Sequence, residues 1–272
     1  MRPFRLVLLA LAVTAILEAI TSAVEWTRPV SYGGRVYWRG QRRRAVALTF
    51  DDGPTAYTPA VLDLLAERQV RATFFALGER VECFPEIAQR IIADGHEIAN
   101  HTYSLACQQL PWRFYLPGVG REVWRGQQAI LKTTGIQPRF FRTPAGQVGR
   151  NLWREVERLD LKVVHGALPI ALPRQSATNQ LAILRRQIAP GAILILHDGL
   201  DSDLESAAPR ATLELLPLLI DTITERGYRI VPLGELLGLD VATAPTRPWR
   251  LGGGRGTRSG ASQQPQQTEG GD

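Results

Sequence analysis

Short apolar runs alternate with amphipathic stretches along most of this chain, and this alternation restricts the fold more than any other feature. Seven runs rich in β-branched and aromatic residues have the length and composition of strands. The stretches between them carry apolar residues at helical spacing, and several begin with Pro or end with Gly. The predicted strands are Ala45–Phe50, Ala72–Ala76, Glu97–Ala99, Arg139–Arg142, Lys162–Val164, Ala192–Leu196 and Arg229–Pro232. The predicted helices are Pro59–Glu67, Pro85–Ala93, Arg121–Lys132, Leu152–Leu159, Gln180–Ile188 and Thr212–Glu225. Because strands that alternate with helices form parallel sheets, the pattern predicts an α/β fold, either a seven-unit barrel or a partial one.

The first 24 residues have the features of an export signal. Arg2 and Arg5 precede the apolar run Leu6–Leu17, and small residues follow it. The run is short for a helix that crosses a membrane, and Glu18 interrupts it. An uncleaved anchor and a helix buried in the core are the alternatives. The segment therefore predicts an exported protein, extracellular, periplasmic or anchored so that it faces outward.

Composition divides the rest of the chain into three parts. Residues 25–41 are predicted to be a linker, and residues 42–240 a single globular domain. Residues 241–272 are dominated by Gly, Gln, Pro, Ser and Thr, which cannot bury enough apolar area to offset the entropy of ordering. This tail is predicted to be disordered.

The formal net charge is +6 and the sequence pI is about 9.8. No zinc finger, recognition helix or stacking-aromatic motif accompanies this charge, so the sequence favours no nucleic-acid partner. An anionic cell envelope or membrane surface is the better match for the positive charge.

Polar residues with catalytic chemistry follow four of the predicted strands. Asp51 and Asp52 follow the first strand, and His101 follows the third. Arg142 ends the fourth strand, and His197 follows the sixth. A single Asp-Asp-Gly-Pro turn is commonly just a solvated loop, and a single His at a strand end is commonly structural. In an α/β barrel, however, all these strand ends open on one face, where active sites lie, so together they predict one active site.

Four short motifs in these positions resemble those of the polysaccharide deacetylases, which share the NodB-homology domain and form carbohydrate esterase family four. The sequence TFDDGP stands at residues 49–54, and GHEIANHT at residues 95–102. RTP stands at residues 142–144, and LHD at residues 196–198. The resemblance covers roughly residues 45–239. It implies an irregular (β/α) barrel that removes N-acetyl groups from a polysaccharide or amino sugar with a divalent metal, commonly zinc.

The resemblance also implies a role for each motif residue. It makes Asp51 the general base, Arg142 the group that keeps Asp51 ionised and oriented, and His197 the general acid that protonates the departing amine. The metal ligands are then Asp52 and His101. The acetyl group would contact Ile195, Leu196 and a backbone N–H near Ala145, a position where an aromatic residue is common in the family.

Two family features are missing from this sequence. The second metal-binding His of the family is Leu105 here, so we expect a weakly held metal. The acidic motif that orients the general acid is also absent, and Leu168 lies in the segment that replaces it. Cys107 or His165 are candidate substitute ligands. Cys107 could instead form a disulfide with Cys83, which would remove it from the site.

Several functions are compatible with these observations. The leading hypothesis is an exported, metal-dependent hydrolase that deacetylates an N-acetylated glycan, such as peptidoglycan or a chitin-like polymer. The alternative is a catalytically impaired carbohydrate-binding protein that keeps the deacetylase fold. An aspartyl-phosphate phosphotransferase is disfavoured because Asp51-Asp52-Gly53 lacks the Asp-x-Asp-x-Thr spacing. A two-carboxylate glycosidase is disfavoured because its acids must stand about 5–9.5 Å apart across a sugar.

Overall fold

Parallel strands form the centre of the structure, a computed structural model that describes residues 36–42, 44–104, 118–144, 150–166, 176–199 and 208–239. Within these ranges, eight strands form one sheet in the order β1-β6-β5-β4-β3-β2-β7, and β8 pairs with β2. All the strand pairs are parallel. The strands are β1 (Val36–Tyr37), β2 (Ala45–Asp51), β3 (Thr73–Ala76), β4 (Glu97–Asn100), β5 (Phe140–Phe141), β6 (Lys162–Val164), β7 (Ile193–His197) and β8 (Arg229–Ile230).

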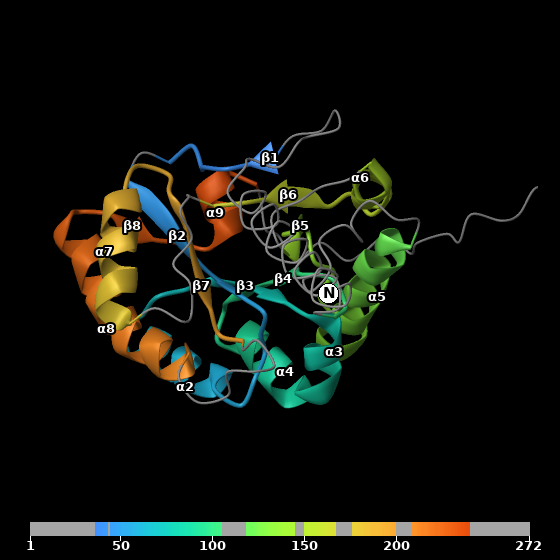
Figure 1. Cartoon of the computed structure of the whole chain (residues 1–272), viewed down its shortest axis with the longest axis horizontal. Helices are drawn as coiled ribbons and strands as arrows, with labels where there is room; N and C mark the ends of the chain where they lie inside the picture. Colours follow the sequence, from blue (N-terminus) through green and yellow to red (C-terminus); the bar gives the residue numbers. More distant parts are fainter. Residues whose placement is uncertain are drawn as a thin grey trace, which may run out of the picture. The chain divides into compact units, whose positions relative to one another are not determined.

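Helices surround these strands, with α2, α4, α5, α7 and α8 on the outside of the sheet (Figure 1). Neighbouring helices pack on one another, α7 on α8 and α5 on α6 for example. The helices are α2 (Thr58–Glu67), α3 (Gly78–Cys83), α4 (Pro85–Ala93), α5 (Val119–Thr134), α6 (Arg150–Arg158), α7 (Ala177–Gln187), α8 (Ala208–Glu225) and α9 (Leu233–Leu237).

The sheet curls into an irregular, partial barrel, which confirms the predicted α/β barrel. Across its open seam, Arg39 makes an isolated antiparallel bridge to Ala192, and the Gly40 N–H donates to the Gly191 carbonyl at 2.7 Å. All seven predicted strands and all six predicted helices are present, with ends that shift by four residues at most. The segment predicted as a linker contributes β1, and α3 and α9 were not predicted.

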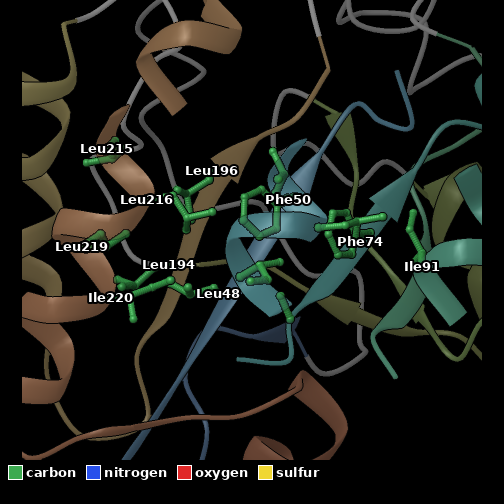
Figure 2. Close-up of a cluster of buried hydrophobic side chains, with 14 of the residues drawn as sticks. Leu48, Phe50, Phe74, Ile91, Leu194, Leu196, Leu215, Leu216, Leu219 and Ile220 are labelled. Atoms are coloured by element: carbon green, nitrogen blue, oxygen red, sulfur yellow. The ribbon is translucent and has the colours of Figure 1, made fainter. Parts of the chain in front are cut away.

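The buried side chains of the described residues form three clusters, and strand β2 contributes to two of them, one on each of its faces. The outer cluster fills the space between the strands and the surrounding helices, and Leu48 and Phe50 of β2 belong to it (Figure 2). Ala45 and Ala47 of the same strand belong to a second cluster, with the α9 side chains. Since alternate residues of a strand face opposite sides, Thr49 and Asp51 share the face of Ala47. Strand β2 is buried along its whole length, as expected of a central parallel strand.

The chain divides into two units, residues 1–242 and 243–272, and every described residue belongs to the first. The predicted export signal, most of the predicted linker and the predicted tail lie outside the described residues and stay predictions. Within the described ranges, no helix combines the length and the apolar composition needed to cross a bilayer.

Candidate active site

The carboxyl ends of the parallel strands bring the predicted polar residues to one edge of the sheet. Asp51 and His197 are the last residues of β2 and β7 and lie side by side in the strand register. Asn100 ends β4 and pairs with Phe141 in β5. His101 and Arg142 therefore follow their strands at neighbouring positions.

A buried ion pair joins Asp51 to Arg142. Arg142 Nη1 donates to Asp51 Oδ1 at 2.6 Å and to Thr49 Oγ1 at 2.8 Å. Its guanidinium lies over the Phe75 ring, 4.0 Å from the ring centre. Both charged side chains are less than a tenth exposed. Burial lowers the pKa of Arg142, and the nearby Asp51 carboxylate opposes that shift. This pair holds the Asp51 carboxylate fixed in direction, as a general base requires.

Asp52 and His101 form a second buried pair beside the first. Asp52 Oδ1 lies 3.4 Å from His101 Nε2. His101 Nδ1 lies 2.8 Å from the Arg142 carbonyl, and because a carbonyl can only accept, Nδ1 carries the proton. In the neutral ring, this leaves the Nε2 lone pair directed at Asp52.

The electrostatics of this second pair favour charge on both members. Burial raises the pKa of Asp52, but the hydrogen bond and charge of His101 outweigh it and bring the value to about 2. Burial lowers the pKa of His101, but Asp51 and Asp52 outweigh it, so the net shift is upward. Each member of the pair therefore stabilises the charged form of the other.

The donor set of Asp52 and His101 fits a divalent metal. A metal-binding His normally donates its other ring N–H to an oxygen acceptor, as His101 does to the Arg142 carbonyl. Carboxylate and imidazole are both zinc ligands. Among the described residues, no third His, Cys, Asp or Glu joins the two. His165, a predicted substitute, does not complete this set.

His165 instead lies on the other side of Arg142. Its carbonyl accepts from Arg142 Nη2 at 3.4 Å, and its ring packs against Trp38. Its Nδ1 accepts from the Gly166 N–H at 2.9 Å. Burial lowers the pKa of His165 to about 4, and the charge of Arg142 adds to that shift. His165 is therefore a neutral residue that helps to hold the Arg142 side chain.

The two residues predicted to contact the acetyl group lie on opposite faces of β7. Ile195 pairs with Thr49 and His197 with Asp51 in the register, so Ile195 shares a face with the charged residues. Leu196 pairs with Phe50 and belongs to the outer core cluster (Figure 2). The structure therefore brings Ile195 to the site and does not bring Leu196 there.

His197 is partly exposed at the end of β7. Its carbonyl accepts from Thr212 Oγ1 at 3.0 Å, and its charge contributes to the lowered pKa of Asp52. It therefore lies close to the Asp52–His101 pair. Its register partner in β2 is Asp51, so the predicted acid and the predicted base stand on adjacent strand ends.

Sequence reasoning gave no role to Asp198, which is 4% exposed. Its Oδ2 accepts from Thr58 Oγ1 at 2.7 Å, and its Oδ1 is buried without a hydrogen-bond partner in the described part of the chain. Burial raises its pKa to about 7, and the charge of Asp52 adds to the rise. The sequence signal that could have identified Asp198 is its place directly after His197 in the LHD motif.

Other predicted positions fall outside the described residues. These are Ala145, Leu105, Leu168 and Cys107. Cys83, its candidate disulfide partner, is exposed at the end of α3. The predicted pairing of Cys83 with Cys107 therefore stays a prediction.

A parallel α/β barrel with the buried pairs Asp51–Arg142 and Asp52–His101 at its carboxyl edge has the architecture of an enzyme. The family model that describes polysaccharide deacetylases matches residues 39–164. A chitooligosaccharide deacetylase of Bradyrhizobium sp. (strain ANU 289) is 34% identical over 205 residues, which cover 71% of this chain and 90% of that protein. The chain therefore belongs to the polysaccharide deacetylase family, whose members hydrolyse N-acetyl amide bonds.

Solved structures agree with this assignment. The crystal structure of the peptidoglycan N-acetylglucosamine deacetylase Bc1960 has a TM-score of 0.67 and 27% identity, covering 75% of this chain and 94% of that chain. A mutant of BA3943, a CE4 family pseudoenzyme from Bacillus anthracis with restored enzymatic activity, has a TM-score of 0.63 and 25% identity. That match covers 75% of this chain and 71% of the other.

Proposed function

We propose that this protein is an exported deacetylase that removes N-acetyl groups from a polysaccharide or amino sugar by metal-assisted acid–base catalysis. The observation that carries the proposal is the buried Asp51–Arg142 pair, 2.6 Å apart and adjacent to the Asp52–His101 pair. A protein that only binds sugar has no need to bury a fixed carboxylate beside a second, cation-accepting pair. The relatives named above include a chitooligosaccharide deacetylase and a peptidoglycan N-acetylglucosamine deacetylase.

In this mechanism Asp51 removes a proton from the water that attacks the acetyl carbonyl. Arg142 keeps Asp51 charged and directed at that water, because its side chain is fixed by Thr49 and Phe75 as well as by Asp51. Positioned acid–base catalysis of this kind contributes roughly 10²–10⁴-fold to a rate.

Asp52 Oδ1 and His101 Nε2 would hold the divalent cation, for which we propose zinc. Bound there, the cation would supply Lewis acidity to the attacking water and to the acetyl carbonyl. Two protein ligands are fewer than the three of most catalytic zinc sites, which supports weak binding. His197 then protonates the nitrogen as the amine departs, and Ile195 packs against the acetyl methyl group.

A second candidate is a catalytically impaired carbohydrate-binding protein. The specific observation in its favour is that the described residues supply two metal ligands where the family uses three. Leu105 in place of the second His has the same implication. The similarity to BA3943 is relevant because that protein is called a pseudoenzyme.

Acetate release separates the two candidates. The metal-free protein is incubated with N-acetylglucosamine oligomers or peptidoglycan, and free acetate is measured before and after zinc is added. The deacetylase hypothesis predicts zinc-dependent acetate release that Asp51→Asn reduces about 10²–10⁴-fold. Asp221→Asn, at an exposed residue paired with Arg68, is the matched control and should retain the activity of the wild type. Oligosaccharide binding by calorimetry without acetate release on either substrate would instead favour the binding protein.

The proposal includes export and an envelope location. Its support is the charged and apolar pattern of residues 1–24 and the net charge of +6, which suits an anionic envelope. Amino-terminal sequencing of the protein recovered from the producing cells tests it. A chain that keeps its first residues in a soluble intracellular fraction would contradict export.

A further inference from the structure

Asp198 follows His197 directly, and its carboxylate packs against the loop of residues 52–55, the Asp52 loop. Thr58 Oγ1 accepts from the Thr55 N–H at 2.8 Å, so its single proton is available for Asp198 Oδ2, 2.7 Å away. Thr55 Oγ1 in turn donates to the Asp198 carbonyl at 2.7 Å. Asp198 thus holds Thr55, the last residue of the loop, in two ways: directly through its carbonyl, and indirectly through Thr58.

Close packing fixes the middle of the same loop. A Cβ added at Gly53 would overlap the Asp198 carboxylate, so the loop lies directly on that group and only Gly fits there. The Gly53 carbonyl also accepts from the Leu77 N–H at 2.9 Å, and the Asp52 carbonyl accepts from Arg80 Nη1 at 2.6 Å. The Asp52 loop therefore has little freedom to move while Asp198 is in place.

Asp52 needs this support because its backbone is left-handed. Its φ is 72°, a region that residues other than Gly seldom occupy. Such a conformation persists only where the surroundings determine it. It directs the Asp52 carboxylate to within 3.4 Å of His101 Nε2.

We propose that Asp198 is a positioning residue that, through Thr58 and Gly53, holds Asp52 in the geometry that binds a divalent cation with His101. The inference rests on the proposed function for the identity of the cation site. Asp198 itself contributes no ligand, since it forms no metal-binding group with Asp52 and His101 in the described part of the chain. Asp198 acts on the position of the Asp52 carboxylate, as do other residues that orient metal ligands without touching the metal.

Zinc affinity measures this effect directly. Competition with a chromophoric chelator gives the zinc dissociation constant of the full chain and of each variant, and calorimetry gives each Tm. Thr58→Val and Asp198→Ala should each weaken zinc binding about 10–100-fold. Asp198→Asn should recover most of the loss, because the amide oxygen can accept from Thr58. Thr222→Val removes a hydroxyl that donates to the Leu218 carbonyl of its own helix, and it should leave zinc affinity unchanged.

Crystal structures of the metal-free wild type and of Thr58→Val supply a second measurement that does not depend on the activity. We expect the separation of Asp52 Oδ1 and His101 Nε2 to increase in the variant. A lower Tm with unchanged zinc affinity in folded variants would overturn the inference, because the role would then be purely structural. If the wild type binds no zinc, the metal part of the proposed function fails. The crystallographic separation then decides the inference, and an unchanged separation overturns it.

Discussion

At the scale of single residues, the structure depends on charges that are buried in matched pairs. Arg142 is the connecting group, since it donates to Asp51, Thr49 and the His165 carbonyl. Removing one member of such a pair leaves the other charge buried without compensation, which costs more than the pair contributes. Residues with a catalytic role are therefore also residues on which stability depends.

Arg142→Met should reduce the free energy of unfolding by about 3–5 kcal/mol, because Asp51 would remain buried without its cation. The double variant with Asp51→Asn should recover part of this loss, since the unpaired charge is then gone, while its acetate release stays far below that of the wild type. Urea unfolding at pH 7 of the wild type, both single variants and the double variant measures the coupling. Strictly additive losses would contradict it.

The two faces of β7 give a second residue-scale prediction. Leu196→Ala should cost about 2–5 kcal/mol of stability, as for other large-to-small core changes, without altering the choice of acyl group. Ile195→Ala should enlarge the site beside Thr49 and raise the rate of propionyl release relative to acetyl release. Competing N-acetyl and N-propionyl substrates measure that ratio. An unchanged ratio in Ile195→Ala would remove this residue from the acyl pocket.

At the scale of elements, helix α5 supports the turn that carries His101. Asn100 Nδ2 donates to the Val123 carbonyl at 2.9 Å, and its Oδ1 accepts from the Thr102 N–H at 2.8 Å. Thr102 has a φ of 75°, so this turn also depends on outside support. A Cβ added at Gly126 would lie 2.5 Å from the Thr102 carbonyl oxygen.

Gly126→Ala should therefore push α5 away from this turn and cost about 1–3 kcal/mol, despite the better helix propensity of Ala. Gly120→Ala is the matched control on the same helix, because its Cβ would come no closer than 3.1 Å to another atom, the Cβ of Glu155. Thermal unfolding and zinc affinity should both change in the first variant and neither should fall in the control. Equal stability of the two variants would show that the close approach tolerates a methyl group.

The elements that the sequence predicted well are those with a local signal. Strand β6 and helix α4 agree with their predicted bounds, since apolar runs and a Pro mark them in the sequence. Strand β1 has two residues, and its stability comes from parallel pairing with β6, more than a hundred residues away in the chain. Helix α9 has five residues and is held by the core cluster that it joins. No local pattern marks such contacts.

The same distinction applies to the site. The strand ends that carry Asp51, Arg142 and His197 follow from the rule that parallel strands end at one edge. The choice of Leu196 ignored strand alternation, which already separates it from Ile195 and His197. The role of Asp198 depends on a hydrogen bond to Thr58, at the other end of the domain sequence, and only coordinates could show it.

At the scale of the whole molecule, stability against acid depends on histidines that are buried neutral. Burial is the main cause that lowers the pKa of both His96 and His165 to about 4. Between pH 4 and 6.5 these histidines are protonated in the unfolded chain but neutral in the folded chain. The free energy of unfolding therefore falls as the pH falls. Asp198 acts in the opposite direction, since its raised pKa adds stability that is lost as the pH rises through about 7. The total profile is therefore a sum of opposed contributions, and a single group must be isolated by substitution.

His96 offers that isolation because it directly precedes β4, whereas His101 follows the opposite end of the same strand. The Nδ1 of His96 accepts from the Ala72 N–H at 3.1 Å. Protonation of Nδ1 would place two N–H donors opposite each other and break this hydrogen bond. His96→Asn keeps an acceptor for that N–H and removes the titration. The stability of the wild type relative to this variant should fall by about 2–3 kcal/mol between pH 6.5 and 4, which urea unfolding at a series of pH values measures. A difference that stays constant over this range would mean that His96 titrates equally in the folded and unfolded chains, and that its burial costs nothing in protonation.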